Sequence, residues 1–473
     1  MAISIHPHPG APEGRRFGAP RDPRAFVRIF IGVFVRDLES FFPGCRVEPL
    51  DDDPPDDSKP RRSRGGGLDF RLVEAPAEDG RRGAVVSLFG ARHRIVPEGP
   101  MGLGDEDLRL IRAMGAVLEL NYQVLFRRSS TSILHLLRGM PEDHYVAARL
   151  EPSAYAPGGS APSRVAEAVL ALRAMALATY ENRRVTTGVL ILGSDVASTP
   201  SPAGALDFGV ELTGLKSLGR LCDGKRAVML VDRAGRLVDV VDVHEWVRRE
   251  TPATAELEVP CPRSYRAHAL ATRQGGHVCL VLGRRQEIKV FSGGAQTFGH
   301  AHGRWRVHDP ASKFAIWRDA VANPRLARVL FQTALELVEE RQGGLLVVFP
   351  EPSRAIGRVI APEDALGGGV EPRSETLGRR SIRYLAEGRS VLAMAPSVVE
   401  AMASLDGALA VDAEGRLLAF GAILRHDASS PRDVAEGART TAAIVASRYG
   451  PVLKISEDGV VSCFLDGFRV WDL

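Results

Sequence analysis

Cysteine is scarce in this 473-residue chain, and its few thiols are not spaced for cross-linking or zinc binding. The five cysteines are scattered and none belongs to a C-x-x-C pair: Cys45, Cys222, Cys261, Cys279 and Cys463. Disulfide-stabilised secreted domains and structural zinc sites both need closely and regularly spaced cysteines. The spacing therefore excludes these two classes and predicts a reducing, cytoplasmic location.

Long hydrophobic runs are also absent. The best apolar stretch is FVRIFIGVFV at residues 26–35, which contains Arg28 and is followed by Arg36 and Asp37. A helix needs about 20 apolar residues to span a bilayer. The first residues, MAISIHPHPGAPEGRR, have no apolar core of a signal peptide. We therefore expect a buried or amphipathic helix at 24–42 and no membrane partner.

An excess of charge of one sign is lacking too. The formal net charge is +3, so the composition shows no electrostatic footprint of nucleic-acid binding, and we expect no nucleic-acid partner. Only six of the 61 basic residues are lysine. The predominance of arginine suits phosphate recognition, because guanidinium groups match phosphate oxygens. A GC-rich coding bias is the simpler explanation.

The length predicts two or three domains. Residues 51–67, DDDPPDDSKPRRSRGGG, contain no apolar side chain and are typical of a solvated linker. A second border is indicated just before a new helix start at Asn323-Pro324. We expect a tail, helix and linker over 1–67, an α+β region over 68–316, and an α/β domain over 317–473.

The elements expected before the second border are mixed. A strand pair is predicted at 68–96 with a turn at Glu78-Asp79-Gly80, and the region 277–308 is rich in β-strand patterns. Further helices are expected at Asp105–Arg128, Ser130–Arg138 and Ser163–Tyr180, and a buried strand is expected at Val185–Leu192. His300, His302 and His308 have the same strand parity, but we expect surface histidines rather than a metal site. Trp305 and Trp317 are expected to be core or interface anchors.

The last domain is predicted to be a mixed sheet covered by helices. Asn323 is a typical helix cap, Pro324 suits the first helical position, and the apolar periodicity runs to Glu340. Gly343-Gly344 ends this helix, and LLVVFP is a buried strand. The order then continues with helices at Ser374–Ala386 and Ser397–Ala403, a hairpin, a helix and a second hairpin.

Two stretches of the chain resemble each other. Residues 213–243 and 398–424 each contain a short helix, Asp-Gly, a buried strand ending in Val-Asp, a glycine turn, Arg-Leu and another strand. A degenerate internal repeat would produce this pattern. Chance recurrence of a common unit in α/β proteins would produce it too.

Three short blocks in the last domain carry candidate chemistry. The first is Asp406-Gly407-Ala408, where a carboxylate at a strand start can hold a divalent cation. The second is Gly437-Ala438-Arg439-Thr440-Thr441, where a helix N-terminus, a guanidinium and hydroxyls suit phosphate. The third is Ser456-Glu457-Asp458-Gly459, which offers a hydroxyl and carboxylates. Alone, each block also fits an ordinary turn or helix cap.

The ordered set resembles the diadenylate cyclase domain of the DNA-integrity-scanning and membrane-bound cyclic di-AMP synthases, over about Leu326 to Gly467. The family's Asp-Gly-Ala block matches Asp406-Gly407-Ala408. Its Gly-Thr-Arg-His-Arg-Ala-Ala block aligns with Gly437 to Ala443, so its His and second Arg are Thr440 and Thr441 here. Its Ser-Glu-Glu-Thr-Gly block aligns with Ser456 to Gly459.

The resemblance implies a site for ATP with a divalent metal, Mg²⁺ or Mn²⁺, on Asp406 and Glu457. Arg439 would clamp phosphate, and the catalytic set would be Asp406, Arg439 and Glu457. The remaining nucleotide contacts implied are Gly407, Ala408, Gly437, Ala438, Thr440, Thr441 and Ser456. Two such domains would face each other in a homodimer or higher homo-oligomer. The region ahead resembles sensor regions that precede some divergent cyclase domains, so an unknown ligand is expected there.

Two functions follow from these observations. In the first, the chain is a sensor-regulated nucleotidyltransferase that condenses two ATP into cyclic di-AMP, or a related dinucleotide, with release of pyrophosphate. In the second, it is a nucleotide-binding signalling protein that keeps the fold without efficient turnover. The two functions differ in whether Thr440 and Thr441 can replace the charged residues of the family. Losing one charged phosphate contact costs about 1.5–3 kcal/mol of binding free energy.

Overall fold

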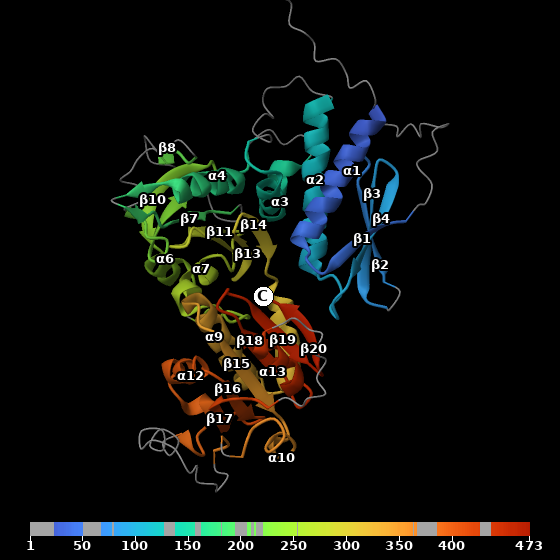
Figure 1. The fold of residues 1–473 in the computed structure, drawn as a ribbon. Helices are drawn as coiled ribbons and strands as arrows, with labels where there is room; N and C mark the ends of the chain where they lie inside the picture. Colours follow the sequence, from blue (N-terminus) through green and yellow to red (C-terminus); the bar gives the residue numbers. More distant parts are fainter. Residues whose placement is uncertain are drawn as a thin grey trace, which may run out of the picture.

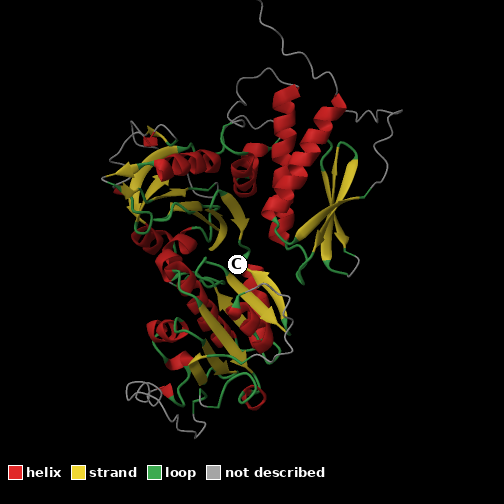
Figure 2. Ribbon diagram, in the orientation of Figure 1, coloured by secondary structure: helices red, strands yellow, loops and turns green. Residues whose placement is uncertain are grey.

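The computed structural model contains three units that follow one another along the chain (Figures 1 and 2). The structure describes residues 23–50, 68–77, 80–126, 138–156, 162–180, 182–193, 206–209, 212–213, 221–252, 254–362, 364–366, 386–425 and 437–473. Most of the expected helices Ser130–Arg138 and Ser374–Ala386, the linker 51–67 and the turn residues 78–79 lie outside the described residues.

The N-terminal unit is an antiparallel sheet packed against long helices. The sheet has the order β1-β4-β3-β2. Its elements are α1 (Pro23–Phe41), β1 (Cys45–Pro49), β2 (Arg71–Pro76), β3 (Arg82–Leu88), β4 (Ala91–Pro97) and α2 (Asp105–Phe126). The segment 68–96 therefore forms three strands, where the alternation predicted a pair. β1 pairs with β4, so the border expected at residue 67 falls inside one sheet.

The middle unit is built on an eight-stranded sheet of order β14-β13-β12-β11-β7-β9-β10-β8. Its strands are β7 (Thr187–Ile191), β8 (Leu206–Asp207), β9 (Ala227–Val231), β10 (Arg236–Asp242), β11 (Val278–Leu282), β12 (Ile288–Ser292), β13 (Ala295–Ala301) and β14 (Arg304–Val307). Its helices are α3 (Pro141–Leu150), α4 (Arg164–Leu177), α6 (Val243–Glu250) and α7 (Arg266–Ala271). A small separate hairpin joins β5 (Thr179–Tyr180) to β6 (Arg183–Arg184).

The C-terminal unit is a six-stranded mixed sheet of order β17-β16-β15-β18-β19-β20. Its strands are β15 (Gly344–Phe349), β16 (Ala408–Asp412), β17 (Leu417–Ala422), β18 (Val452–Ile455), β19 (Val461–Leu465) and β20 (Phe468–Asp472). Its helices are α8 (Pro310–Val321), α9 (Pro324–Glu340), α10 (Pro352–Ala355), α12 (Pro396–Ala403) and α13 (Ala438–Ala446). The predicted α/β class is confirmed.

Helix α9 begins where the sequence predicts. The Asn323 side chain accepts a hydrogen bond from the Leu326 N–H at 3.2 Å, and Pro324 occupies the first turn. The Asn323 amide also donates to the Ala413 carbonyl at 3.0 Å, which ties the helix start to the turn between β16 and β17. Every residue of β15 behind this helix is buried.

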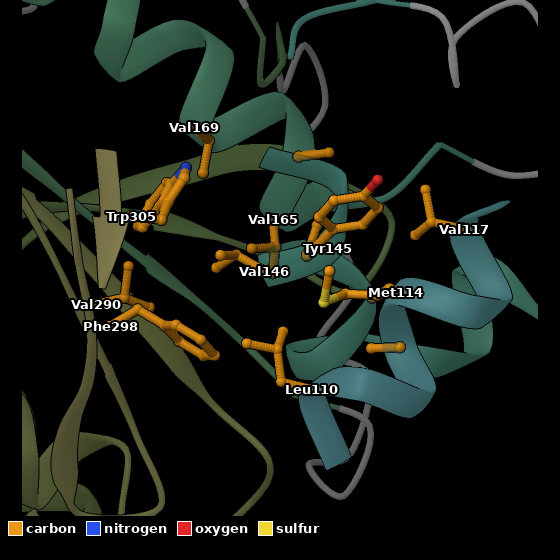
Figure 3. Packing of buried hydrophobic residues seen from close by; sticks show 14 of the residues in the cluster. Leu110, Met114, Val117, Tyr145, Val146, Val165, Val169, Val290, Phe298 and Trp305 are labelled. Carbon is orange, nitrogen blue, oxygen red and sulfur yellow. The ribbon is translucent and has the colours of Figure 1, made fainter. Parts of the chain in front are cut away.

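Two buried clusters account for most of the core. The larger one runs from Phe34 to Trp305 and joins the N-terminal and middle units, whereas the cluster around α9 begins at Phe314. Figure 3 shows Trp305 facing the helices α3 and α4. Its indole N–H donates to Asp143 at 2.8 Å, and burial raises the pKa of that carboxyl. Trp317 is also fully buried, so both tryptophans are core anchors as expected.

The middle and C-terminal sheets share one topology. The strand order β13-β12-β11-β7-β9-β10 corresponds to β20-β19-β18-β15-β16-β17. In each unit the first strand along the chain is parallel to the second, and every other neighbour within these sets is antiparallel. Helices α4 and α9 precede the first of these strands, and α7 and α13 precede the fourth.

The strand registers match as well. In the middle unit, Val189 on β7 is paired with Met229 on β9 and with Leu280 on β11. In the C-terminal unit, Leu346 on β15 is paired in the same way with Leu409 on β16 and with Leu453 on β18. The last hairpins, β12–β13 and β19–β20, bulge at equivalent residues, at Val290/Phe291 and Cys463/Phe464, because Ile288 corresponds to Val461. Bulges are specific features of a fold, so their coincidence indicates the same unit built twice.

The hairpins compared in the sequence are equivalent parts of these units. Asp232 accepts hydrogen bonds from the N–H groups of Ala234 at 2.8 Å and Arg236 at 2.9 Å. Asp412 accepts from Glu414 at 3.0 Å and Arg416 at 2.7 Å. The internal repeat is thus confirmed for β9–β10 and β16–β17, while residues 214–220 lie outside the described part.

None of the described helices is both long and apolar enough to cross a membrane.

The cap of α9 gives a first test. We expect Asn323→Ala to lower the free energy of unfolding by about 1–2 kcal/mol, because it removes a helix cap and the bond to Ala413. Asn323→Asp keeps the cap acceptor and should cost less. Urea denaturation of the three proteins measures both, and equal stability of wild type and Asn323→Ala would contradict this role.

Candidate functional site

The three sequence blocks meet at one edge of the C-terminal sheet. Arg439, near the start of α13, lies between two carboxylates. Its Nη1 is 3.5 Å from Glu457 Oε1, and its Nη2 is 3.9 Å from Asp406 Oδ1. These distances describe ion pairs rather than tight hydrogen bonds. The structure therefore brings together Asp406, Arg439 and Glu457, which lie far apart in the sequence.

Sheet topology explains this meeting. β15 lies between β16, which runs parallel to it, and β18, which runs antiparallel (Figure 1). The starts of β15 and β16 and the end of β18 therefore share one edge. Gly344 pairs with Ile455 there, which places the turn after β18 next to the residues that precede β15.

Two glycines make room at this edge. A Cβ on Gly343 would lie 2.0 Å from Arg439 Nη1, so the guanidinium passes directly over a residue without a side chain. Gly407 has a φ of +111°, and a Cβ there would lie 2.5 Å from the backbone of Gly421. Gly407 needs glycine for conformation and space, whereas a side chain at Gly343 would displace the Arg439 guanidinium.

The start of α13 leaves backbone donors available. Gly437 is the N-cap and forms no side-chain cap, and its carbonyl accepts the N–H groups of Thr440 at 2.8 Å and Thr441 at 3.3 Å. Among the described residues, no hydrogen bond to the N–H groups of Ala438 and Arg439 is found. Free N–H groups at a helix start favour an anion.

Thr440 does not point its hydroxyl at the open edge. The residue is buried, and its Oγ1 accepts a hydrogen bond from Lys454 Nζ at 2.9 Å. Lys454 lies on β18, and its ammonium group stands beside Thr440. At Thr440 and Thr441 the resembling family has a histidine and an arginine, so the lysine supplies a positive charge there. The sequence interpretation missed this lysine, although its rarity in an arginine-rich chain was the available signal.

The turn after β18 is stabilised by hydrogen bonds from its own residues and from the end of α9. Ser456 Oγ lies 3.5 Å from Asp458 Oδ2 and accepts from the Asp458 N–H at 3.4 Å, so its hydroxyl serves the turn. Arg341, which ends α9, donates to the carbonyls of Glu457 and Asp458. Arg341 was also missed, because nothing in its local sequence indicates this contact.

A divalent metal fits the edge only with outside ligands. The Asp406 side chain is 90% exposed and the Glu457 side chain 71% exposed. Within the described residues, no group of three or more His, Cys, Asp or Glu is arranged to hold an ion. Mg²⁺ is commonly held by one or two carboxylates together with substrate phosphates and water. The donor set suits that mode of binding.

His300, His302 and His308 of the middle unit are not part of this site. His300 accepts from Arg173 at 2.8 Å and packs on Trp305, and burial lowers its pKa to about 4. Burial lowers the pKa of His308 to about 3. Only His302 is exposed, so the expectation of surface histidines was wrong for the other two.

Comparison with known proteins adds little. No family model and no curated protein matches the chain. Among solved structures, a hypothetical membrane spanning protein from Bacillus cereus is 19% identical, with a TM-score of 0.23, over 34% of this chain and 71% of that one. DacA from Staphylococcus aureus, a diadenylate cyclase solved as a double cysteine variant, is 18% identical, with a TM-score of 0.20, over 31% and 87%. TM-scores this low say nothing of this chain's activity.

The contact between Thr440 and Lys454 can be tested alone. We expect Thr440→Val, which keeps the shape but removes the acceptor, to lower the free energy of unfolding by about 1 kcal/mol. Thr441→Val is the matched control, because no side-chain bond of Thr441 is found among the described residues. Chemical denaturation compares the two, and equal stabilities would show that the Lys454 contact is not formed.

Proposed function

We propose that the C-terminal unit is a metal-dependent nucleotidyltransferase that condenses two ATP into cyclic di-AMP or a related cyclic dinucleotide. The observation that carries this proposal is the position of Arg439, held between two exposed carboxylates at a helix start with free N–H groups. Exposed ion pairs contribute only about 0–1 kcal/mol, so stability gives little reason for this arrangement.

The phosphate contacts come from one side of the site. Arg439 is the guanidinium that binds the triphosphate, and Gly437 and Ala438 present the helix start. Lys454 adds a second positive charge beside Thr440. Thr441, half-buried one residue further along α13, is the remaining hydroxyl of this block.

The nucleoside side is formed by the start of β16. Gly407 lets the chain pass close to the backbone of β17, and Ala408 begins the buried strand directly after the exposed Asp406. Ser456 contributes by fixing the turn that carries Glu457. Asp406 and Glu457 would hold Mg²⁺ or Mn²⁺, which lowers the pKa of a bound hydroxyl and neutralises phosphoryl charge.

The proposed reaction consists of two equal transfers. The 3′-oxygen of one ATP forms a bond to the α-phosphorus of the other, and the bond from that phosphorus to the oxygen bridging to the β-phosphorus breaks. Pyrophosphate leaves with the electron pair, and the hydroxyl proton passes to solvent. Arg439 stabilises the charge that develops on the phosphoryl group. The second transfer closes the ring.

Two sites must face each other for this chemistry, so we propose a homodimer or higher oligomer. Exposed apolar side chains on this part of the C-terminal unit support such a contact. Leu405 is 46% exposed, Ile423 62% and Val398 44%. A Cβ on Gly421 would lie 3.8 Å from Leu405 Cβ, so Leu405 borders the end of β17.

One observation favours a second function, nucleotide binding without efficient turnover. Thr440 and Thr441 stand where the resembling family has charged residues, and the Thr440 hydroxyl is already engaged by Lys454. Lys454 offsets part of the lost charge. Turnover therefore remains our first choice, and the absence of product in the following test would select the second.

The assay uses the full chain with ATP and Mg²⁺ or Mn²⁺, and mass spectrometry identifies the products. We expect a cyclic dinucleotide and pyrophosphate from the wild type, and a loss of at least tenfold in Asp406→Asn, because that change removes one of two metal carboxylates. Asp319→Asn, an exposed carboxylate on α8, is the matched control and should keep full activity. Product formed equally by Asp406→Asn would refute the assigned site.

The dimer contact has its own test. Leu405→Glu with Ile423→Glu should shift the protein from dimer to monomer in analytical ultracentrifugation and abolish the product, while each chain still binds ATP. Leu177→Glu, at a residue 90% exposed on α4, changes a surface leucine far from the site and should do neither. A monomeric wild type that makes the product would contradict the facing arrangement.

A further inference from the structure

A cavity of about 1030 Å³ lies between the middle and C-terminal units. Its walls come from both units, with Lys225, Tyr265, Arg284 and Arg285 on one side and Arg341 and Asp458 on the other. The units are joined beside it by α9, where Arg263 N donates to Glu336 at 2.7 Å. Pockets of this size, about 300–1,000 Å³, accommodate small ligands.

The middle unit contributes to the cavity wall the part of its sheet that is equivalent, in the repeat, to the candidate site of the C-terminal unit. The turn 283–287 follows β11 as the turn 456–460 follows β18. Leu282 pairs with Ile288 across the first turn, and Ile455 pairs with Val461 across the second, so both turns have the same length. The cavity therefore opens on the second copy of the candidate site edge.

Charge is reversed between the two copies. Arg284 and Arg285 occupy the positions that correspond to Glu457 and Asp458. Arg266 corresponds to Arg439, because each precedes equivalent strand residues, Cys279 and Val452, by the same number of positions. Two guanidinium groups thus replace the carboxylates at these two positions, although the turn keeps Glu287 at its end, and the arginine in the first turn of the helix is kept. An edge of this composition favours an anion and not a metal ion.

The basic side chains at this edge are available. Arg284 and Arg285 are exposed, and within the described residues neither forms an ion pair or side-chain hydrogen bond. Lys225 Nζ stands 5.6 Å from the centre of the Tyr265 ring. The nearby Asp223 is fixed in its own turn, because its Oδ1 accepts three backbone N–H groups at 2.7–3.0 Å.

The acidic residues of the cavity are partly engaged. Glu339 is paired with Lys289, and Glu457 lies near Arg439. Glu287 is folded beneath Gly283, where a Cβ would lie 2.3 Å from its Oε1, and no hydrogen-bond partner of its buried Oε2 is found among the described residues. Glu340 and Asp458 stand on the opposite wall. On the middle unit, Lys225, Arg284 and Arg285 therefore outnumber Glu287.

We propose that this cavity binds a phosphate-bearing anion without a divalent metal, through Arg284, Arg285, Lys225 and Arg341, and that the bound anion regulates the candidate site. Arg341 provides the link, since it donates to the carbonyls of Glu457 and Asp458. An anion that attracts Arg341 loosens this contact and shifts the turn that positions Glu457 against Arg439. The regulatory half rests on the proposed function, but the binding half does not.

Binding is tested with sodium tripolyphosphate in EDTA, using the full chain and calorimetry. We expect one saturable site in the wild type and a loss of at least tenfold in affinity in the double variant Arg284→Glu/Arg285→Glu. Arg248→Glu/Arg249→Glu on α6 changes charge equally elsewhere and should bind as the wild type does. Arg439→Ala should also bind normally, because it alters only the other copy of the edge.

Several results would overturn the binding claim. They are absence of saturable binding in EDTA, unchanged affinity in Arg284→Glu/Arg285→Glu, or loss of binding in Arg439→Ala alone. Thermal melting of each variant confirms that it is folded. ATP in EDTA forms a second arm: affinity at least tenfold above that of tripolyphosphate identifies a nucleotide as the ligand, and equal affinity identifies a free polyphosphate.

Regulation is tested in the product assay with excess Mg²⁺. Tripolyphosphate should change the rate of the wild type by at least threefold, beyond any change seen in Arg284→Glu/Arg285→Glu, which retains the candidate site. Equal responses of the two proteins would refute regulation through the cavity. If no product forms in any protein, the proposed function fails, whereas the binding result in EDTA stands by itself.

Discussion

The candidate site depends on one guanidinium held between two carboxylates across the edge of a sheet. Arg439 reaches Glu457 and Asp406 across Gly343, which has no side chain, and β15 brings the two carboxylates near by running beside both β16 and β18. The ion pairs are exposed and stabilise the fold little. They concentrate charge of both signs at a helix start, which is the arrangement that a metal-bound triphosphate requires.

The same six-strand frame occurs twice in the chain, and the two copies carry opposite charge on equivalent turns. Glu457 and Asp458 follow β18, whereas Arg284 and Arg285 follow β11. Because the edge of the middle unit opens on a cavity shared with the C-terminal unit, a ligand there would touch Arg341 and the turn of the candidate site. Under the two proposals, this duplicated fold with different charge on equivalent turns would link a bound anion to the candidate site.

Local chemistry made part of this structure predictable. Asn323-Pro324 predicted the start of α9, and the apolar run before Pro350 predicted a buried strand. That the three blocks belong to one site was implied by the family resemblance. Long-range pairing was not predictable in the same way. β1 joins β4 across the linker, Lys454 reaches Thr440 from another strand, and Arg341 reaches the turn after β18 from a helix end. The repeat was visible in one hairpin, but its extent required the registers of all six strands.

The most direct test of the central claim is a crystal structure of the full chain with a non-hydrolysable ATP analogue and Mg²⁺. The account predicts the triphosphate at the start of α13, in contact with Arg439, with the metal between the phosphates and the carboxylates of Asp406 and Glu457. A triphosphate bound only in the cavity beside Arg284, or an ordered analogue away from Arg439, would contradict the assignment of the candidate site.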